Sequence, residues 1–415
     1  MAKKNHRTFF VIGFVVVMVS GLFVCRFNPM DEDNSKEPTN TGQKNQMDIQ
    51  PVHVLEQHGF HFELTQKGLP VHGQWRGCPD VGDFNRDGNL DLVCSNRKGD
   101  GLHVFLGDGK GGFTDHSKGF DHLLGYGGAS VGDFNNDEIP DILFSTHRVP
   151  MVAYAYDGKS TWADLSEGFN NKEIFHDVAS ADFDGDGNLD VAGLGLFGGG
   201  IVLFSGNGKG KWARAPFNPV EERKFGREII AADIDEDGTP DIIATHIGIK
   251  ALLNQGGFKF KDISRGLPVP RTLGTYSGVA AANVDGRKGM EIATASIAIE
   301  GNRGLAVYTR SDDGLWKLMS NGLPEGKSCS AVTFADFNCD GKMDLAAGSE
   351  DTGINIYLGD GTGSWSHAGT IPKTKLHKIT FTTGDFNNDN RTDLIVVYPD
   401  SPGGVICFLN RAFNP

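Results

Sequence analysis

The chain repeats one pattern of polar and apolar positions along most of its length. Each copy is an acidic loop of ten residues between two short apolar runs. Runs this short, with β-branched residues and turns at both ends, predict strands. The loops begin 50, 49, 51, 50, 53 and 49 residues apart, a period typical of repeat architectures. The seven loops start at Asp83, Asp133, Asp182, Asp233, Asn283, Asp336 and Asp385.

Each unit predicts four antiparallel strands. In one unit they are the run before its loop, the run after it, a third run such as IVLFSGNGKG from Ile201, and an amphipathic fourth such as GKWARAPF. Four strands in each of seven units predict an all-β, seven-bladed β-propeller. A small residue precedes every loop, which indicates a crowded position where innermost strands converge. These residues are Gly82, Gly132, Ala181, Ala232, Ala282, Ala335 and Gly384.

The two ends of the chain predict that the ring closes. The last copy stops after its third strand, at VICFLNRAFNP. A segment like a fourth strand, HGFHFELTQKGLP, precedes the first copy and resembles GGFKFKDISRGLP from Gly256. We therefore expect residues 57–70 to complete the last blade of a propeller that spans 57–415.

The N-terminal residues 1–26 predict a signal anchor or a signal peptide. Positive residues precede an apolar run that ends at Cys25; they are Lys3, Lys4 and Arg7. Seventeen apolar residues are the lower limit for a membrane-spanning helix, and Val19-Ser20-Gly21 also fits a cleavage site. Both alternatives export the rest of the chain. Residues 27–56 are polar and predict a disordered linker. We expect the protein to be extracytoplasmic: periplasmic, at the cell surface or secreted.

The acidic loop has the chemistry of a calcium site. It places side-chain oxygens at positions 1, 3, 5 and 9 and a backbone carbonyl at position 7, as hard cations require. In the first copy these donors are Asp83, Asn85, Asp87 and Asp91. Clustered carboxylates without a cation would repel one another strongly.

Position 6 of the loop requires a sharp turn. Glycine occupies it in most copies and Asn390 suits it in the last, whereas Glu138 in the second copy fits less well. An EF-hand shares this opening pattern but needs Glu at position 12. Other residues stand there, and strands flank the loops, so the EF-hand is excluded. The residues at position 12 are Cys94, Phe144, Gly193, Ala244, Ala347 and Val396.

The repeated loop motif resembles that of the FG-GAP/VCBS repeat proteins, whose blades also form the integrin α-subunit propeller. The resemblance covers nearly everything after residue 57, and it implies Ca²⁺ between the first two strands of a blade. It extends the calcium ligands of the first copy to five more copies, giving up to six ions with a structural role. These ligands are Asp133, Asn135, Asp137, Asp141, Asp182, Asp184, Asp186, Asp190, Asp233, Asp235, Asp237, Asp241, Asp336, Asn338, Asp340, Asp344, Asp385, Asn387, Asp389 and Asp393.

The fifth copy departs from the motif. It carries Asn283, Asp285, Arg287 and Glu291 at the ligand positions. Because Arg287 supplies a positive charge itself, we predict no metal in this loop.

Composition narrows the function further. The formal net charge is −14, which argues against a nucleic-acid partner because phosphates require a basic surface. No C-x-x-C motif occurs among the six cysteines. Cys78 and Cys94 fall where neighbouring strands could pair them, although two buried thiols are the favoured interpretation. No G-x-S-x-G or H-E-x-x-H motif and no complete P-loop occurs, so we expect no enzyme.

The loops on the face opposite the acidic loops carry different chemistry. Aromatic, His and Arg side chains on one face suit an anionic, sugar or protein ligand. The leading hypothesis is a protein-binding or complex-assembly module, membrane-bound if the N-terminal segment is uncleaved. The alternatives are a lectin-like propeller and a polysaccharide lyase or dehydratase that uses His and Tyr. The residues are His72, Trp75, Arg76, Arg97, Tyr126, His147, Arg148, His176, Arg227, His246, Tyr276, Lys327, Glu350, His377 and Tyr398.

Overall fold

The computed structural model of this chain describes residues 53–413 with internal gaps. The gaps are 98–100, 121–124, 149, 160, 170–172, 197–199, 217–218, 220–225, 246–247, 270–275, 297–302, 350, 373–378 and 400–403. The predicted signal segment and most of the predicted linker therefore lie outside the described residues. Within the described part, no helix is long and apolar enough to cross a membrane.

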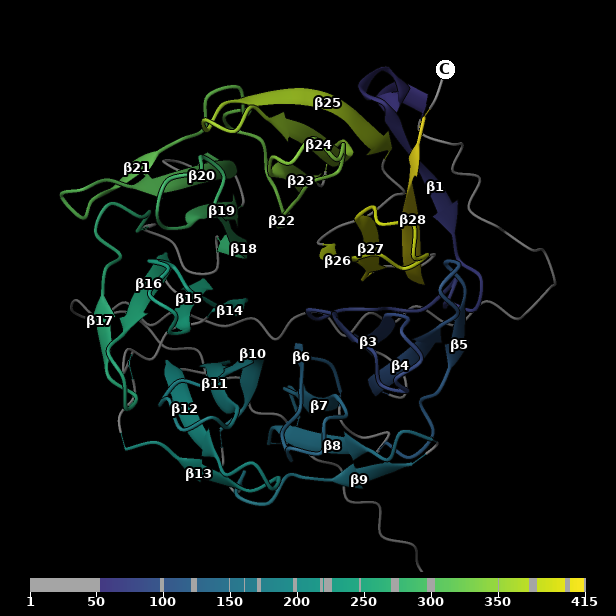
Figure 1. Ribbon diagram of the computed structural model, residues 1–415, viewed down its shortest axis with the longest axis vertical. Coiled ribbons are helices and arrows are strands. Elements are labelled where there is room, and N and C mark those ends of the chain that lie inside the picture. The colour runs from purple at the N-terminus through teal and green to yellow at the C-terminus, as the bar shows by residue number, and fades with distance from the viewer. Residues whose placement is uncertain are drawn as a thin grey trace, which may run out of the picture. The chain divides into compact units, whose positions relative to one another are not determined.

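The described residues form seven antiparallel sheets of four strands each, arranged as blades around a central axis (Figure 1). The prediction of an all-β, seven-bladed propeller is confirmed. Blades one to three are β2(Asp80–Gly82) to β5(Phe113–Asp115), β6(Ala129–Gly132) to β9(Trp162–Asp164), and β10(Phe175–Ala181) to β13(Trp212–Arg214). Their middle strands are β3(Asp91–Asn96), β4(Gly101–Gly107), β7(Asp141–Phe144), β8(Val152–Tyr156), β11(Asp190–Gly195) and β12(Ile201–Gly206).

The remaining blades follow the same order from the axis to the rim. Blade four has β14(Ile229–Ala232), β15(Asp241–Thr245), β16(Ile249–Asn254) and β17(Phe260–Asp262). Blade five has β18(Tyr276–Ala282), β19(Glu291–Ser296), β20(Leu305–Arg310) and β21(Trp316–Leu318). Blade six has β22(Ala331–Ala335), β23(Asp344–Ser349), β24(Gly353–Gly359) and β25(Trp365–Pro372). Blade seven has β26(Thr380–Gly384), β27(Asp393–Tyr398), β28(Gly404–Ala412) and, as its outer strand, β1(Phe60–Thr65).

The ring is closed by strands from opposite ends of the chain. β1 pairs with β28 in antiparallel register from Phe60 opposite Ala412 to Thr65 opposite Cys407. Each first strand contacts the first strand of the next blade, and β26 of blade seven contacts β2 of blade one. A closed ring of this kind leaves only short outer edges exposed.

The segment just before β1 is folded, although its first residues fall within the linker predicted for residues 27–56. Residues His53–His58 form a 3₁₀ helix, η1, which packs on β1 and β25. Leu55 is fully buried in the core formed by blades six and seven. Burial of this leucine stabilises the 3₁₀ helix against the propeller.

Aromatic pairs join neighbouring blades. The second residue of a loop packs on an aromatic residue in the fourth strand of the following blade. Ring centroids are 5.6 Å apart for Phe84 and Trp162, and 5.5 Å apart for Phe134 and Trp212. Phe337 pairs in the same way with Phe62 of β1, at 5.8 Å. Each acidic loop is thus anchored in a core between two blades.

The small residues before the loops occupy a crowded position, as predicted. A Cβ atom added to Gly132 would lie 2.5 Å from Leu189 of the next blade's loop, and one on Gly384 would lie 2.5 Å from Leu90. The crowding comes from the neighbouring blade. Cys78 and Cys94 are free thiols, as the favoured interpretation predicted, but only Cys94 is buried and Cys78 is half-buried.

Candidate functional site

Backbone amides hold the oxygens of each acidic loop together. In the first loop, Asp83 accepts hydrogen bonds from the amides of Asp87, at 3.0 Å, and Gly88, at 2.8 Å. The side-chain oxygen of Asn85 accepts a second bond from Asp87 N at 3.0 Å. The loops at Asp133 and Asp336 repeat this pattern. The conformation of the loop is therefore held by hydrogen bonds from backbone amides to the side-chain oxygens that were predicted to bind a cation.

The carboxylate at position 9 connects the loop to the blade. Asp91 is fully buried; its Oδ2 accepts a bond from Phe84 N and its Oδ1 one from Gly107 N, both at 2.8 Å. Burial, opposed by these amides, raises the pKa of Asp91 to about 7, and Asp87 and Asp83 add to the rise. Equivalent carboxyls have a pKa raised by burial to about 7, or to about 6 for Asp241: Asp141, Asp190, Asp241, Asp344 and Asp393.

Two loops bring three carboxylates to one point. Ligand atoms lie within 4.8 Å of one another in the group Asp182, Asp184 and Asp190 and in the group Asp233, Asp235 and Asp237. The pKa of Asp184 is raised by burial and by the charges of Asp186 and Asp182. A hard cation at such a point would offset both effects, so these oxygens fit calcium.

Position 6 adopts the left-handed backbone conformation in the second and seventh loops, where it is not glycine. The φ angle is 67° at Glu138 and 63° at Asn390. Glu138 points to the preceding loop, where Arg86 binds its carboxylate at 3.1 Å. The second loop thus keeps the conformation of the others, and the cost lies in the strained backbone of a non-glycine residue.

Arginine side chains enter two of the loops. In the fifth loop, Arg287 pairs with Asp285, and Arg287 Nη2 also donates to Thr309 Oγ1 at 3.2 Å. A guanidinium therefore stands where the other loops offer an oxygen. In the seventh loop, Arg411 Nη1 lies 3.2 Å from Asp389 Oδ2, a contact that the sequence did not indicate. A cation bound there would compete with Arg411.

The structure divides the residues predicted for the opposite face into four groups. His72, Arg148 and Lys327 are exposed. Trp75, Tyr276 and Tyr398 are buried in the core, which corrects their assignment to a ligand surface. His246, Glu350 and His377 lie outside the described residues. Six others come together from four blades and are called here the basic–aromatic cluster: Arg76, Arg97, Tyr126, His147, His176 and Arg227.

Three neighbouring rings, those of Tyr126, His147 and His176, form the centre of the basic–aromatic cluster. The rings of Tyr126 and His147 lie 4.1 Å apart, and those of His147 and His176 lie 4.8 Å apart. The guanidinium carbons of Arg76 and Arg97 lie 5.4 and 5.6 Å from the centre of the Tyr126 ring. Burial, followed by the charges of the three arginines, lowers the pKa of His147 to about 4, so its imidazole is neutral at pH 7.

Acidic residues on the inner strands were missed at the sequence level. Asp80, Asp177 and Glu228 line a pocket of about 350 Å³ together with Cys78, and none of the lining residues is basic. Burial raises the pKa of Asp80 to about 6, of Asp177 to about 7 and of Glu228 to about 8. Cys78, Asp177 and Glu228 all stand five residues before a loop, where glycine, alanine or threonine occurs in the other copies. This shared repeat position is the sequence signal that could have identified Asp177 and Glu228.

These acids also bind one blade to the next. Asp80 accepts a hydrogen bond from Val131 N of blade two at 2.8 Å. Asp177 accepts one from Ile229 N of blade four at 2.9 Å, and Glu228 accepts one from Val279 N of blade five at 2.9 Å. Their first role is therefore structural.

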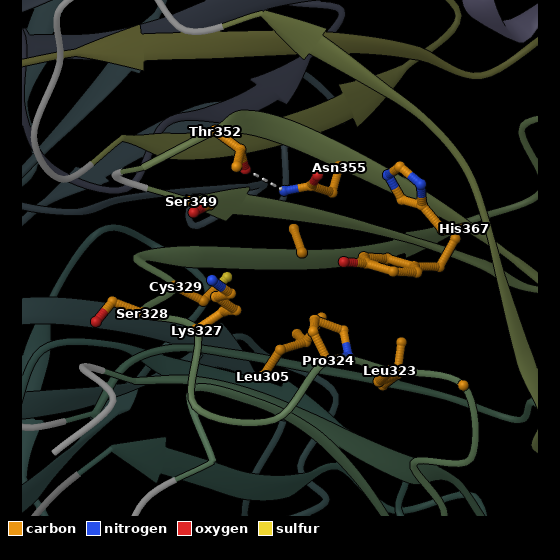
Figure 2. Close-up of a pocket in the computed structure, with 13 residues that line it drawn as sticks. Leu305, Leu323, Pro324, Lys327, Ser328, Cys329, Ser349, Thr352, Asn355 and His367 are labelled. Carbon is orange, nitrogen blue, oxygen red and sulfur yellow. Dashed lines mark hydrogen bonds between the residues drawn. The ribbon is translucent and has the colours of Figure 1, made fainter.

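A second hollow, of about 430 Å³, lies between blades five and six. Figure 2 shows an apolar wall with Leu305 and Pro324 facing a polar wall with Thr352 and Asn355. Asn355 Nδ2 donates to Thr352 Oγ1 at 2.9 Å, and Asn355 Oδ1 accepts from Thr370 Oγ1 at 2.8 Å. These bonds fix the polar wall.

The closed ring and its oxygen-rich hairpin loops define a seven-bladed β-propeller. The family model described as FG-GAP-like repeat matches residues 83–144, 133–193, 182–244 and 336–396, together more than half of the chain. The chain belongs to this repeat family. The recognised resemblance is thereby confirmed, while its calcium remains a prediction.

Solved structures share the fold. Two structures of BBS1N in complex with ARL6DN, soaked with mercury or with lead, each match with a TM-score of 0.52, at 10% and 11% identity. The matches cover 82% of this chain and 93% or 94% of those chains. No curated protein sequence matches this chain. At such identity the likeness concerns the fold alone.

Proposed function

We propose that this protein is an exported, membrane-tethered and calcium-stabilised propeller that binds a partner protein or helps to assemble a complex. The observation that carries the proposal is the basic–aromatic cluster, which four blades of a closed ring present together. Arg and Tyr are residues that interfaces favour. BBS1N, which has a similar fold, is bound to another protein in its structures, and this is compatible with such a role.

Export and tethering are inferred from the N-terminal sequence. The apolar run from Phe9 follows three positive residues, which favours an N-terminus that stays in the cytoplasm. Calcium is inferred from the donor sets of six loops and from the two carboxylate groups that converge. Weak sites suffice outside the cytosol, where calcium is abundant.

A pull-down from gently solubilised membranes tests the proposal. The tagged full chain is captured once with calcium and once with a chelator. A stoichiometric partner that is lost with the chelator supports a binding role that depends on the metal-held fold. Absence of any partner under both conditions contradicts it. The variant Asp184→Ala, which removes one oxygen donor of the third loop, should weaken capture only when calcium is limiting.

The hollow between blades five and six favours a carbohydrate-binding alternative. It combines an apolar wall with fixed amide and hydroxyl groups, as sugar sites do, and Lys327 and His367 line it as well. A glycan array with the calcium-loaded full chain tests this function. Binding that is abolished by Asn355→Ala would support it, and a silent array would exclude it.

A further inference from the structure

The backbone under the basic–aromatic cluster is held in place before any ligand arrives. Buried hydroxyls at the ends of the second strands perform this task. Ser95 Oγ donates to the carbonyl of Gly127, at 3.2 Å, next to Tyr126. Ser145 Oγ donates to the carbonyl of His176 at 3.1 Å. Such bonds reduce the conformational entropy that these connections would otherwise lose when a ligand binds.

Thr245 completes this support in blade four. Its Oγ1 accepts a bond from Arg227 N at 2.9 Å. The same strand position is thus occupied by Ser95, Ser145 and Thr245 in three of the blades that supply the cluster. Each hydroxyl fixes a connection that carries a cluster residue, so the cluster is preorganised.

The chemistry of the cluster is that of an anion site. Arg76, Arg97 and Arg227 all act on His147 as positive charges. The Nε2 atom of His147 is buried and makes no hydrogen bond to any described residue. A buried polar nitrogen that lacks a partner is costly, and an external ligand oxygen would satisfy it.

The neighbouring acids supply little charge to this site. Asp177 and Glu228 follow His176 and Arg227 directly in the chain. Because burial raises their pKa values to about 7 and about 8, protonated forms persist at neutral pH. The positive field of the arginines is therefore reduced only in part by these carboxyls.

We propose that the basic–aromatic cluster binds a carboxylate, and that this carboxylate is an acidic side chain of the partner protein. A planar carboxylate matches the fork of a guanidinium, and Tyr and neutral His add hydrogen-bond donors. The choice of a protein carboxylate rests on the proposed function. A uronic acid or a phosphate would present similar oxygens, and the test separates these sources.

The experiment is a calorimetric titration of the full chain, in mild detergent, with a tri-glutamate peptide. Binding is expected, and Arg97→Gln should weaken it about tenfold, as the loss of one charged hydrogen bond does. Arg97→Lys keeps the positive charge but loses the forked geometry of the guanidinium. Its affinity for tri-glutamate should therefore lie between those of the native chain and Arg97→Gln. Arg214→Gln at the outer strand β13, where Arg214 pairs with Glu173, is the matched control and should bind normally.

A second readout covers the case in which Arg97→Gln folds poorly. The imidazole NMR signals of His147 should move when tri-glutamate is added to the native chain, and tri-glutamine should leave them unchanged. Equal binding of both peptides overturns the proposal, as does full binding by a folded Arg97→Gln variant.

Two further titrations identify the source of the anion. Binding of an oligogalacturonate or of inorganic phosphate without binding of tri-glutamate overturns the protein carboxylate. The pull-down separates this inference from the proposed function. A partner captured equally by the native chain and Arg97→Gln overturns the carboxylate site and keeps the binding role. Binding of tri-glutamate without any captured partner keeps the carboxylate site and overturns the protein-binding role.

Discussion

Asp177 offers a direct test of the acidic pocket on the axis. Its side chain is 1% exposed, and its Oδ1 has no hydrogen-bond partner among the described residues. Burial raises its pKa from 3.8 to about 7. The folded state therefore favours the neutral acid. The stability that protonation supplies is fully present below pH 3.8 and is lost as the pH rises to about 7.

The magnitude follows from the size of this pKa difference. At about 1.4 kcal/mol for each pH unit, the native chain should lose roughly 4 kcal/mol of unfolding free energy across this range. Asp177→Asn is neutral at every pH and can still accept the hydrogen bond from Ile229 N. We expect the variant to gain stability over the native chain by this amount between pH 4 and pH 7.

The assay is urea unfolding in excess calcium, followed by tryptophan fluorescence at several pH values. The difference between the two proteins cancels the titration of the acidic loops and leaves that of Asp177 with the neighbours it affects, Glu228 and Cys78. Asp351→Asn, at an exposed turn, is the control and should show no trend with pH. A constant difference between native chain and Asp177→Asn from pH 4 to pH 8 would refute the reasoning.

Three other changes probe the loops and the ring. Equilibrium dialysis should find six calcium ions on the native chain and one fewer on Asp184→Ala, which lacks the side-chain oxygen; an unchanged number would refute the assignment. Phe62→Ala should cost about 3–5 kcal/mol in urea unfolding, because it empties the closing strand's contact with Phe337; a loss below about 1 kcal/mol would contradict that role. Gly77→Ala should lower the thermal midpoint more than Gly256→Ala, since only the first Cβ meets a backbone oxygen, at 1.9 Å; equal losses would count against it.

The fold could be predicted because its determinants are local and repeated. Each loop from Asp83 to Asp385 carries its own turn and donors, and each apolar run carries its own strand propensity. The aromatic second position, as in Phe84, was visible, but its partner Trp162 in the next blade was not. Packing between blades depends on the rotation from one repeat to the next, which no local pattern encodes.

The same distinction between local and long-range determinants applies to the candidate sites. The side-chain oxygens of one acidic loop lie within nine residues, so spacing alone brings them together, as in Asp182, Asp184 and Asp190. The contact of Arg411 with Asp389 escaped prediction because it crosses from β28 to the loop before β27. Trp75 and Tyr276 were misplaced because an aromatic residue in a connection can turn inward to the core as readily as outward.

The sequence by itself determined the number of blades, their strands and the oxygen donors of the loops, because these follow from spacing within one repeat. Only the tertiary structure decided which residues meet across repeats. Arg76, His147 and Arg227 lie in separate repeats, and the arrangement of the blades around the axis brings them together. Burial at that junction then sets the pKa of His147 and of Asp177, a property that depends on surrounding atoms and not on the order of residues.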